Sequence, residues 1–235
     1  ETGAANVGGP MLPNGATAFG AAVAAALQHP LGVGDAKFHF EDAGGFVDTV
    51  YMGAFRKEAF ARAGLFDESM VRNQDYEMNV RIRKTGGTIF LDPRIRSHYT
   101  PRSDLPSLFR QFFQYGWWRV ETLRRHPDSL RWRQLVPPVF VAVLLLLGLL
   151  AIFLPVARLG LGSLIAVYLL ALGGAAVAEG NRLPARVKLR VPLALATIHF
   201  SWGLGFLVSL ASGGRLPFRA GEAMTPALDL SQEAP

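Results

Sequence analysis

Cysteine is absent from all 235 residues. This absence excludes disulfide bonds, thiolate catalysis and zinc sites that depend on cysteine ligands. The sequence also has no Gly-x-Gly-x-x-Gly fingerprint, no P-loop and no Asp-x-Asp pair. The usual phosphate-binding turn of an α/β nucleotide-binding domain is therefore missing. Charge is scarce after Leu135, where long runs carry almost none.

Half of the residues are hydrophobic, and the formal net charge is +6. A basic chain can bind nucleic acid, but here the arginines flank apolar segments instead of forming one stripe. A membrane face rich in anionic lipid explains that distribution better. The composition therefore predicts a membrane partner and no nucleic-acid partner.

Strands and helices alternate through the first 100 residues, which is typical of an α/β fold. Residues 44–53 read as a turn and a β-branched, aromatic strand, and Ala-rich residues 16–27 read as a helix that His29-Pro30 stops. Only part of a sheet is covered. The other expected elements are helices over 55–63, 76–85 and about 107–125, strands over 88–91 and 95–100, and a loop over 31–42.

Three later segments are apolar over lengths that cross a bilayer, so the α/β part is followed by α-helical transmembrane segments. They are residues 135–156, 159–178 and 191–211, the last interrupted by His199 and Ser201.

The arginines and lysines predict the orientation of these spans. Basic residues precede the first span and separate the second from the third, whereas only Arg158 separates the first from the second. We therefore expect the α/β part and the 179–190 loop in the cytoplasm. The tail after the third span should face outward, although Arg215 and Arg219 count against this. The basic residues concerned are Arg119, Arg124, Arg125, Arg131 and Arg133, and then Arg182, Arg186, Lys188 and Arg190.

Residues 109–119 combine aromatic side chains with arginine at high density. One interpretation is an interfacial helix with its rings at headgroup level and its arginines toward phosphates. The other is a helix that packs in the core beside the sheet.

Asp75 and Glu77 are two residues apart, so on a helix they do not share a face. That spacing argues against a paired-carboxylate glycosidase site. One carboxylate at a helix N-terminus is stabilised as the anion, which suits a base that takes a proton from a sugar hydroxyl. The alternative is that Asp75 is only an N-cap.

Other polar residues leave alternatives open. Asp48 either joins a site or is an edge-facing carboxylate, and we favour the latter. His98 is a candidate metal or phosphate ligand, but no ligand cluster surrounds it, so we expect no metal site in this chain. His199 is unusual within an apolar span. A diphosphate site and a solvated basic face are the two interpretations of Arg94, Arg96, Arg102 and Arg110.

Three motifs follow one another in a telling order. They are the Gly-rich strand over residues 44–57, the turn Gly64-Leu65-Phe66-Asp67-Glu68, and the acidic motif Asn73-Gln74-Asp75-Tyr76-Glu77. In this order they resemble the later half of family 2 inverting glycosyltransferases, in the membrane-attached branch that builds bacterial exopolysaccharides such as succinoglycan. Residues 110–118 lie where relatives carry a Gln/Arg-rich, Trp-containing helix. They depart from the Gln-x-x-Arg-Trp form of processive synthases, which argues for addition of a single sugar.

The resemblance implies a division of the chain and a set of roles. Residues 1–106 would be the C-terminal part of a GT-A-like domain with a Rossmann-related sheet, 107–134 an amphipathic interfacial helix and juxtamembrane segment, 135–212 three transmembrane helices, and 213–235 a tail. Asp75 would be the catalytic base. The residues expected to bind the acceptor or its phosphates are Glu77, Arg102, Arg110, Gln111, Gln114, Trp117 and Trp118.

The implied reaction is inverting transfer from a nucleotide-diphosphate sugar to a lipid-linked oligosaccharide, by a multi-pass protein of the bacterial plasma membrane with a cytoplasmic catalytic part. The family's donor-binding half carries a metal-binding Asp-x-Asp that is missing here. Mg²⁺ or Mn²⁺ is therefore expected only in the complete enzyme, and this chain alone should be inactive. The competing hypothesis is a non-catalytic membrane-anchored scaffold or polysaccharide export component.

Overall fold

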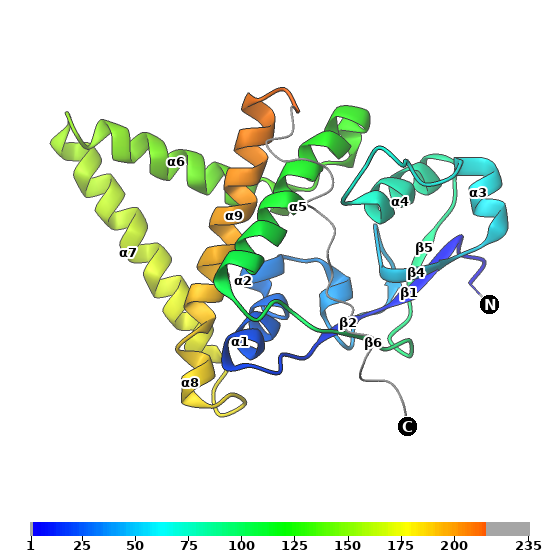
Figure 1. Cartoon of the computed structure of the whole chain (residues 1–235), viewed down its shortest axis with the longest axis horizontal. Helices are drawn as coiled ribbons and strands as arrows, with labels where there is room; N and C mark the ends of the chain where they lie inside the picture. Colours follow the sequence, from blue (N-terminus) through cyan, green and yellow to red (C-terminus); the bar gives the residue numbers. More distant parts are fainter. Residues whose placement is uncertain (1, 215–235) are drawn as a thin grey trace.

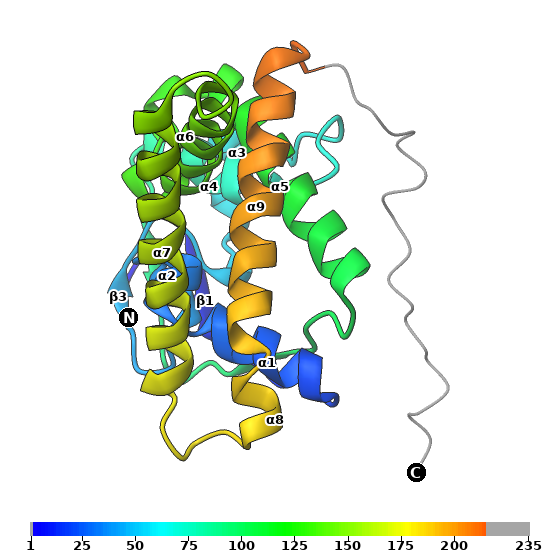
Figure 2. The ribbon, with the colours of Figure 1, turned by 90° about the vertical axis from the view of Figure 1, so that its left-hand side faces the viewer.

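A computed structural model describes residues 2–214 of the chain. An α/β part and a long hairpin of helices α6 (Val136–Leu150) and α7 (Pro155–Ala178) lie at opposite ends of the molecule (Figure 1). Two long helices, α5 (Leu105–Arg125) and α9 (Val191–Ala211), lie between them. Helix α7 lies close to α9 at its C-terminal end, near α8, and diverges from α9 toward α6 (Figure 1 and Figure 2). The fold is therefore α/β followed by apolar helices, as the sequence predicts.

The larger sheet has four short strands in the order β3-β5-β1-β4. Its central strand β1 pairs in parallel with β5 and antiparallel with β4, while β3 is antiparallel to β5. The expected single strand over residues 44–53 is therefore wrong, because the chain crosses from one edge of the sheet to the other. The bounds are β1 Asn6–Gly9, β3 Gly45–Phe46, β4 Tyr51–Phe55 and β5 Ile89–Leu91.

A second sheet consists of β2 (Met11–Pro13) and β6 (Ser97–Tyr99) in parallel register. Leu12 pairs with His98, so Tyr99 is fixed next to Pro13 at the end of the pair. This small sheet carries the chain from the main sheet toward α5.

The helices of the α/β part agree with the expected ranges to within a few residues. The Thr17 hydroxyl accepts a hydrogen bond from the Gly20 amide and caps α1, an ordinary N-cap arrangement. The expected loop over residues 31–42 instead holds two short helical turns. The bounds are α1 Ala18–Leu27, α2 Pro30–Val33, η1 Lys37–His39, α3 Lys57–Ala63, α4 Gln74–Lys84, α5 Leu105–Arg125, η2 Pro127–Ser129 and η3 Trp132–Gln134.

Three helices after residue 131 are long and apolar enough to span a membrane, by length and composition. They correspond to the three predicted spans, and they make this a candidate membrane protein. The bounds are α6 Val136–Leu150, α7 Pro155–Ala178, the short α8 Ala185–Lys188, and α9 Val191–Ala211. The expected orientation of the tail concerns residues 215–235, which lie outside the described residues.

The largest hydrophobic core joins the α/β part to these apolar helices. Val23 and Ala26 of α1 and Leu108 of α5 pack in one cluster with Leu172 of α7 and Leu195 of α9. Each is nearly or fully buried. The α/β part and the C-terminal helices are therefore held by a shared core.

Candidate active site

The start of α4 is shaped by a left-handed residue, Asn73, whose φ is 63°. Asparagine tolerates this conformation better than most residues. Asn73 is itself the N-cap, and Asp75 is the second residue inside the helix. The N-cap interpretation of Asp75 is therefore wrong by position, and its carboxylate lies in the first turn.

A chain of buried amides fixes α4 to the sheet. Asn6 Nδ2 of β1 donates to Asn79 Oδ1 at 2.7 Å, and Asn79 Nδ2 donates to Thr49 Oγ1 at 3.0 Å. All three side chains are buried. Because buried polar groups are costly unless they are hydrogen-bonded, these hydrogen bonds specify the position of α4, and with it that of Asp75.

Asp75 is exposed on one side while protein surrounds its carboxylate on the others. Burial raises the pKa of Asp75, and a hydrogen bond from the Tyr76 amide to Oδ1, 2.8 Å long, opposes the rise. No basic side chain is bonded to the carboxylate in the described structure. A carboxylate with a raised pKa and an open side is suited to accept a proton.

Tyrosines and a glutamine from three elements gather near Asp75. Gln111 Nε2 of α5 donates to the hydroxyl oxygens of Tyr99, at 2.9 Å, and Tyr115, at 3.0 Å. The rings of Tyr99 and Tyr51 meet edge to face at 6.1 Å. Burial raises the pKa of Tyr51 and Tyr115, and the nearby negative charge of Asp75 adds to the rise in both.

The loop before α4 is attached to the same face of α5. Arg72 Nε donates to Gln114 Oε1 at 3.2 Å, and Asn73 Nδ2 lies 3.4 Å from the Tyr115 carbonyl oxygen. The structure thus brings together Asp75, Gln111 and Gln114 from the expected set of site residues.

Glu77 is directed elsewhere, into a buried ion-pair network. Its side chain is 3% exposed, and its carboxylate accepts from Arg81 Nε and His126 Nε2, each at 2.8 Å. Burial by itself would raise the pKa of Glu77, but these hydrogen bonds outweigh it and lower the pKa. This arrangement serves stability and leaves Glu77 poorly placed to bind an acceptor.

The two expected tryptophan contacts are inside the protein. Trp117 is 1% exposed and Trp118 is 7% exposed, and both pack against Met70. This is the core-packing alternative for α5, whose other contacts are mainly with α9. The indoles support the loop before α4 from behind, so they are not available to stack on a sugar.

The remaining candidates do not converge on Asp75. Arg110 and His98 are exposed, and Arg102 is half-buried. Within residues 2–214 no group of three His, Asp or Glu side chains could hold a metal ion. Two of the arginines of the expected diphosphate cluster have carboxylate partners: Arg94 bonds to Asp92, and Arg96 to Glu41.

Asp48 has a structural role that the sequence did not reveal. It lies between β3 and β4, where its Oδ2 accepts from Arg133 at 2.9 Å and lies 3.4 Å from Arg131. Arg133 also bonds to Asp35. The expectation of an edge-facing carboxylate is therefore wrong, because these pairs connect the α/β part to the residues just before α6.

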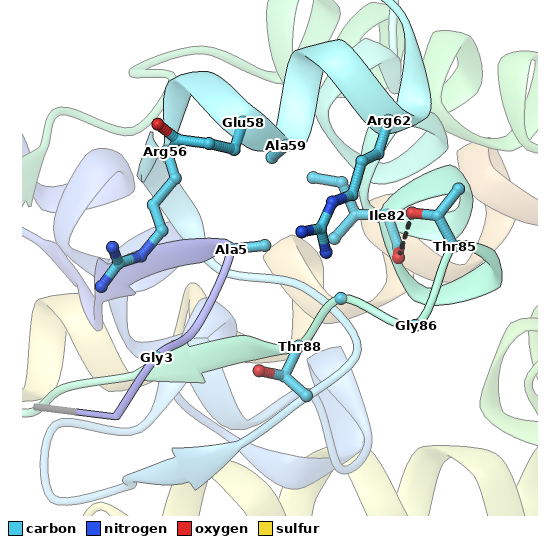
Figure 3. A pocket seen from close by; sticks show the side chains of 11 residues that line it. Gly3, Ala5, Arg56, Glu58, Ala59, Arg62, Ile82, Thr85, Gly86 and Thr88 are labelled. Atoms are coloured by element: carbon cyan, nitrogen blue, oxygen red, sulfur yellow. Dashed lines mark hydrogen bonds between the residues drawn. The ribbon is translucent and has the colours of Figure 1, made fainter.

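A pocket of about 370 Å³ lies away from Asp75. Arg56 and Arg62, at the start and end of α3, line it together with residues of the 85–88 turn (Figure 3). Ile82 and Thr85, which line this pocket, are at the far end of α4 from Asp75. The pocket is therefore separate from Tyr51, Tyr99 and Tyr115, which we call the tyrosine cluster.

Two known proteins are similar to this chain in sequence. Over 206 residues the chain is 32% identical to the succinoglycan biosynthesis protein ExoA of Rhizobium meliloti (strain 1021), covering 87% of this chain and 61% of ExoA. The chain is a distant relative of ExoA. The match confirms the similarity to a succinoglycan biosynthesis protein, while the reaction and the roles of individual residues stay predictions.

A second relative is archaeal. The chain is 25% identical over 185 residues to the dolichyl N-acetyl-α-D-glucosaminyl phosphate 3-β-D-2,3-diacetamido-2,3-dideoxy-β-D-glucuronosyltransferase of Methanococcus voltae, covering 77% of this chain and 52% of that protein. The chain thus spans less than two thirds of each relative. No family model and no solved structure matches it.

Sequence reasoning missed the three tyrosines. One signal was available: Gln111 and Tyr115 are four residues apart on a helix that was expected, so they share a face. Nothing local pointed to Tyr51 or Tyr99, because they come from separate strands that meet α5 only in the fold.

Proposed function

We propose that the chain is the acceptor-side part of an inverting glycosyltransferase at the bacterial plasma membrane. The longer protein would transfer a sugar from a nucleotide-diphosphate donor to a hydroxyl of a lipid-linked oligosaccharide during exopolysaccharide synthesis. The observation that carries the proposal is the carboxylate of Asp75, which lies open on one side in the first turn of α4, next to hydroxyl groups. The relationship to ExoA, a succinoglycan biosynthesis protein, supports it.

In this proposal Asp75 is the catalytic base. It takes the proton of the acceptor hydroxyl as that oxygen attacks the anomeric carbon, the bond from that carbon to the diphosphate breaks, and the nucleoside diphosphate leaves. Attack from the face opposite the leaving group inverts the configuration. Burial raises the pKa of Asp75 toward the working pH, which strengthens it as a base.

The tyrosine cluster would orient the acceptor sugar. The Gln111 amide donates to the oxygens of both Tyr99 and Tyr115, so each phenol keeps its own O–H to donate. Gln111 Oε1 itself is buried and has no hydrogen-bond partner in the described structure. The two phenol O–H groups are therefore the donors that this cluster offers to the oxygens of a sugar.

Mg²⁺ or Mn²⁺ remains part of the proposal for the longer protein only. The described residues of this chain offer no ligand set for a divalent ion. No step above depends on one.

The test is sugar transfer by the protein expressed from its gene in bacterial membranes. We expect Asp75→Asn to insert into membranes at wild-type levels and to lose at least about 100-fold in transfer of labelled sugar to lipid, a loss typical of removing a general base. Asp75→Glu should recover part of the activity. The exposed acid Glu68 gives the control Glu68→Gln, which should behave as wild type. Near-normal transfer by Asp75→Asn would contradict the proposal and favour a non-catalytic scaffold.

A further inference from the structure

The three candidate membrane helices differ sharply in their surroundings. Only 11% of the apolar window is buried within the protein for Trp132–Leu150 and for Pro155–Ala178, against 56% for Ala185–Ala211. By length and composition α9 is a candidate membrane span like α6 and α7, but by its burial it is a helix of the protein core.

The N-terminal half of α9 is packed against the α/β part. Leu195 and Ile198 belong to the same core as α1. Gly32 of α2 lies so close to α9 that a Cβ there would be 3.1 Å from the Leu195 side chain. His199, in the middle of α9, lies with Nε2 2.8 Å from the Leu31 carbonyl oxygen. The α/β part therefore holds this half of the helix through both packing and a hydrogen bond.

The C-terminal half of α9 lies along α5 at backbone contact. A Cβ on Gly205 would be 2.1 Å from the Phe113 carbonyl oxygen, and a Cβ on Gly116 would be 2.1 Å from the Trp202 carbonyl oxygen. Near the end of α9, Arg124 Nη2 donates to the Ser209 carbonyl oxygen at 2.9 Å. Contacts with α1 and α5 thus extend over about 27 Å of α9, at 1.5 Å per residue.

These contacts are incompatible with α9 crossing a bilayer. The α5 segment beside its C-terminal half contains Arg119, Glu121, Arg124 and Arg125. If α9 spanned the hydrocarbon, this charged segment would lie at membrane depth, where charged side chains are strongly disfavoured. An aqueous location for α5 keeps most of α9 out of the bilayer.

The α6–α7 hairpin has the opposite character. Its apolar side chains are largely exposed. The bend between α6 and α7 projects away from the α/β part (Figure 1). At this bend, Arg158 Nε donates to the Ala151 carbonyl oxygen at 2.7 Å. Basic residues lie at both ends of the hairpin away from its bend, and this is the pattern of cytoplasmic ends. They are Arg131 and Arg133 before α6, and Arg182 and Arg186 after α7. The exposed apolar residues include Val139, Leu145, Leu146, Leu149, Ile152, Phe153, Val156, Leu159, Val167, Leu169, Leu170 and Val177.

We infer that the lipid bilayer surrounds only the α6–α7 hairpin, and that α9 is an internal helix that joins the hairpin to the α/β part. Both ends of α9 then lie on the same side of the membrane as Asp75. This reverses the outward orientation that the sequence predicts for the end of the third apolar segment. The inference is independent of the chemistry at Asp75.

The absence of cysteine from these 235 residues makes a direct test possible, since a thiol introduced here has no native thiol beside it in this part of the protein. Three single variants are placed at exposed positions: Glu68→Cys in the α/β part, Ile152→Cys in the hairpin turn, and Ala211→Cys at the end of α9. Each is labelled with a membrane-impermeant maleimide in intact spheroplasts and in inverted membrane vesicles. The wild-type protein is the background control, and its labelling is subtracted from that of each variant.

We expect Glu68→Cys and Ala211→Cys to be labelled only in inverted vesicles and Ile152→Cys only in spheroplasts. A second measurement uses two separate C-terminal fusions. Cells with the green fluorescent protein fusion should be fluorescent, and cells with the alkaline phosphatase fusion should have no phosphatase activity. Labelling of Ala211→Cys from the side opposite to Glu68→Cys, or an active phosphatase fusion, would overturn the inference for α9. Labelling of Ile152→Cys from the Glu68 side would overturn it for the hairpin.

Discussion

The two sides of the first turn of α4 place carboxylates in opposite environments. Asp75 is open on one side, has no basic partner bonded to it in the described structure, and has a pKa that burial raises. Glu77 is 2% exposed, and hydrogen bonds from Arg81 and His126 lower its pKa in spite of burial. Two residues of separation thus divide a candidate for chemistry from a structural ion pair.

One helix thus carries two carboxylates, Asp75, whose ionised form is disfavoured by burial, and Glu77, whose ionised form is stabilised by hydrogen bonds. The amide chain through Asn79 and the Glu77 network hold α4 firmly on the sheet side. That support allows the carboxylate of Asp75 to remain without a basic partner among residues 2–214, on the other side of the helix, where its ionised form costs free energy. Sites with such a cost are stable only when the surrounding contacts over-determine them.

The largest expected effect on stability is at Glu77, on the buried side of α4. Glu77→Gln leaves the guanidinium of Arg81 without its carboxylate in a largely buried network, which should cost about 2–3 kcal/mol. For a chain of this size that corresponds to a Tm lower by about 5–10 °C. Thermal unfolding in detergent, followed by circular dichroism, measures it.

The matched control is Asp75→Asn, the same chemical change on the open side. Since the ionised Asp75 is disfavoured in the folded state, its replacement should leave the Tm unchanged or raise it. If the two variants lost equal stability, the contrast between the two sides of α4 would not hold.

The next effect is the pH dependence of stability, which should have opposite signs for the two residues. The lowered pKa of Glu77 means that its contribution is present above the ordinary glutamate pKa of 4.5 and is lost as the pH falls through the folded value. The raised pKa of Asp75 means that stability falls as the pH rises from the ordinary 3.8 through its folded value.

Thermal unfolding at a series of pH values separates these contributions. Glu77→Gln should flatten the loss of stability at acidic pH, whereas Asp75→Asn should raise the curve above the folded pKa of Asp75. Superimposable curves for wild type and Asp75→Asn would show that the pKa of Asp75 is not raised.

The sequence could not separate these two roles. It identified Asp75 and Glu77 together because the motif holds both, but His126, which binds Glu77, is 49 residues further along the chain. Likewise, Arg133 is 85 residues from Asp48. Partners that meet only through the tertiary fold leave no local pattern in the sequence.

The fold was more predictable than the site, since most of its elements have their own periodicity or apolar length. Helices α1, α4 and α5 and the ranges of the apolar helices followed from that. The burial of α9 did not, because an apolar helix in a protein core and one in lipid have the same composition. The clue was its Gly203, Gly205 and Ser201, all buried, whereas a Cβ on Gly173 or Gly174 of α7 would meet nothing.

The smallest expected change in stability is on the open side, at Gln111. Gln111→Leu removes the donor that holds Tyr99 and Tyr115, at a cost of about 1–2 kcal/mol for two hydrogen bonds to phenol oxygens. In contrast to Glu77→Gln, this variant should lose more activity than stability. The KM for the lipid acceptor should rise about tenfold, because the tyrosines lose their fixed orientation. The KM for the nucleotide sugar should stay unchanged. Steady-state transfer assays with each substrate varied measure this. Gln28→Leu, at an exposed glutamine at the end of α1, is the control and should match wild type. An unchanged acceptor KM in Gln111→Leu would mean that the tyrosine cluster is part of the packing alone and that Asp75 acts without it.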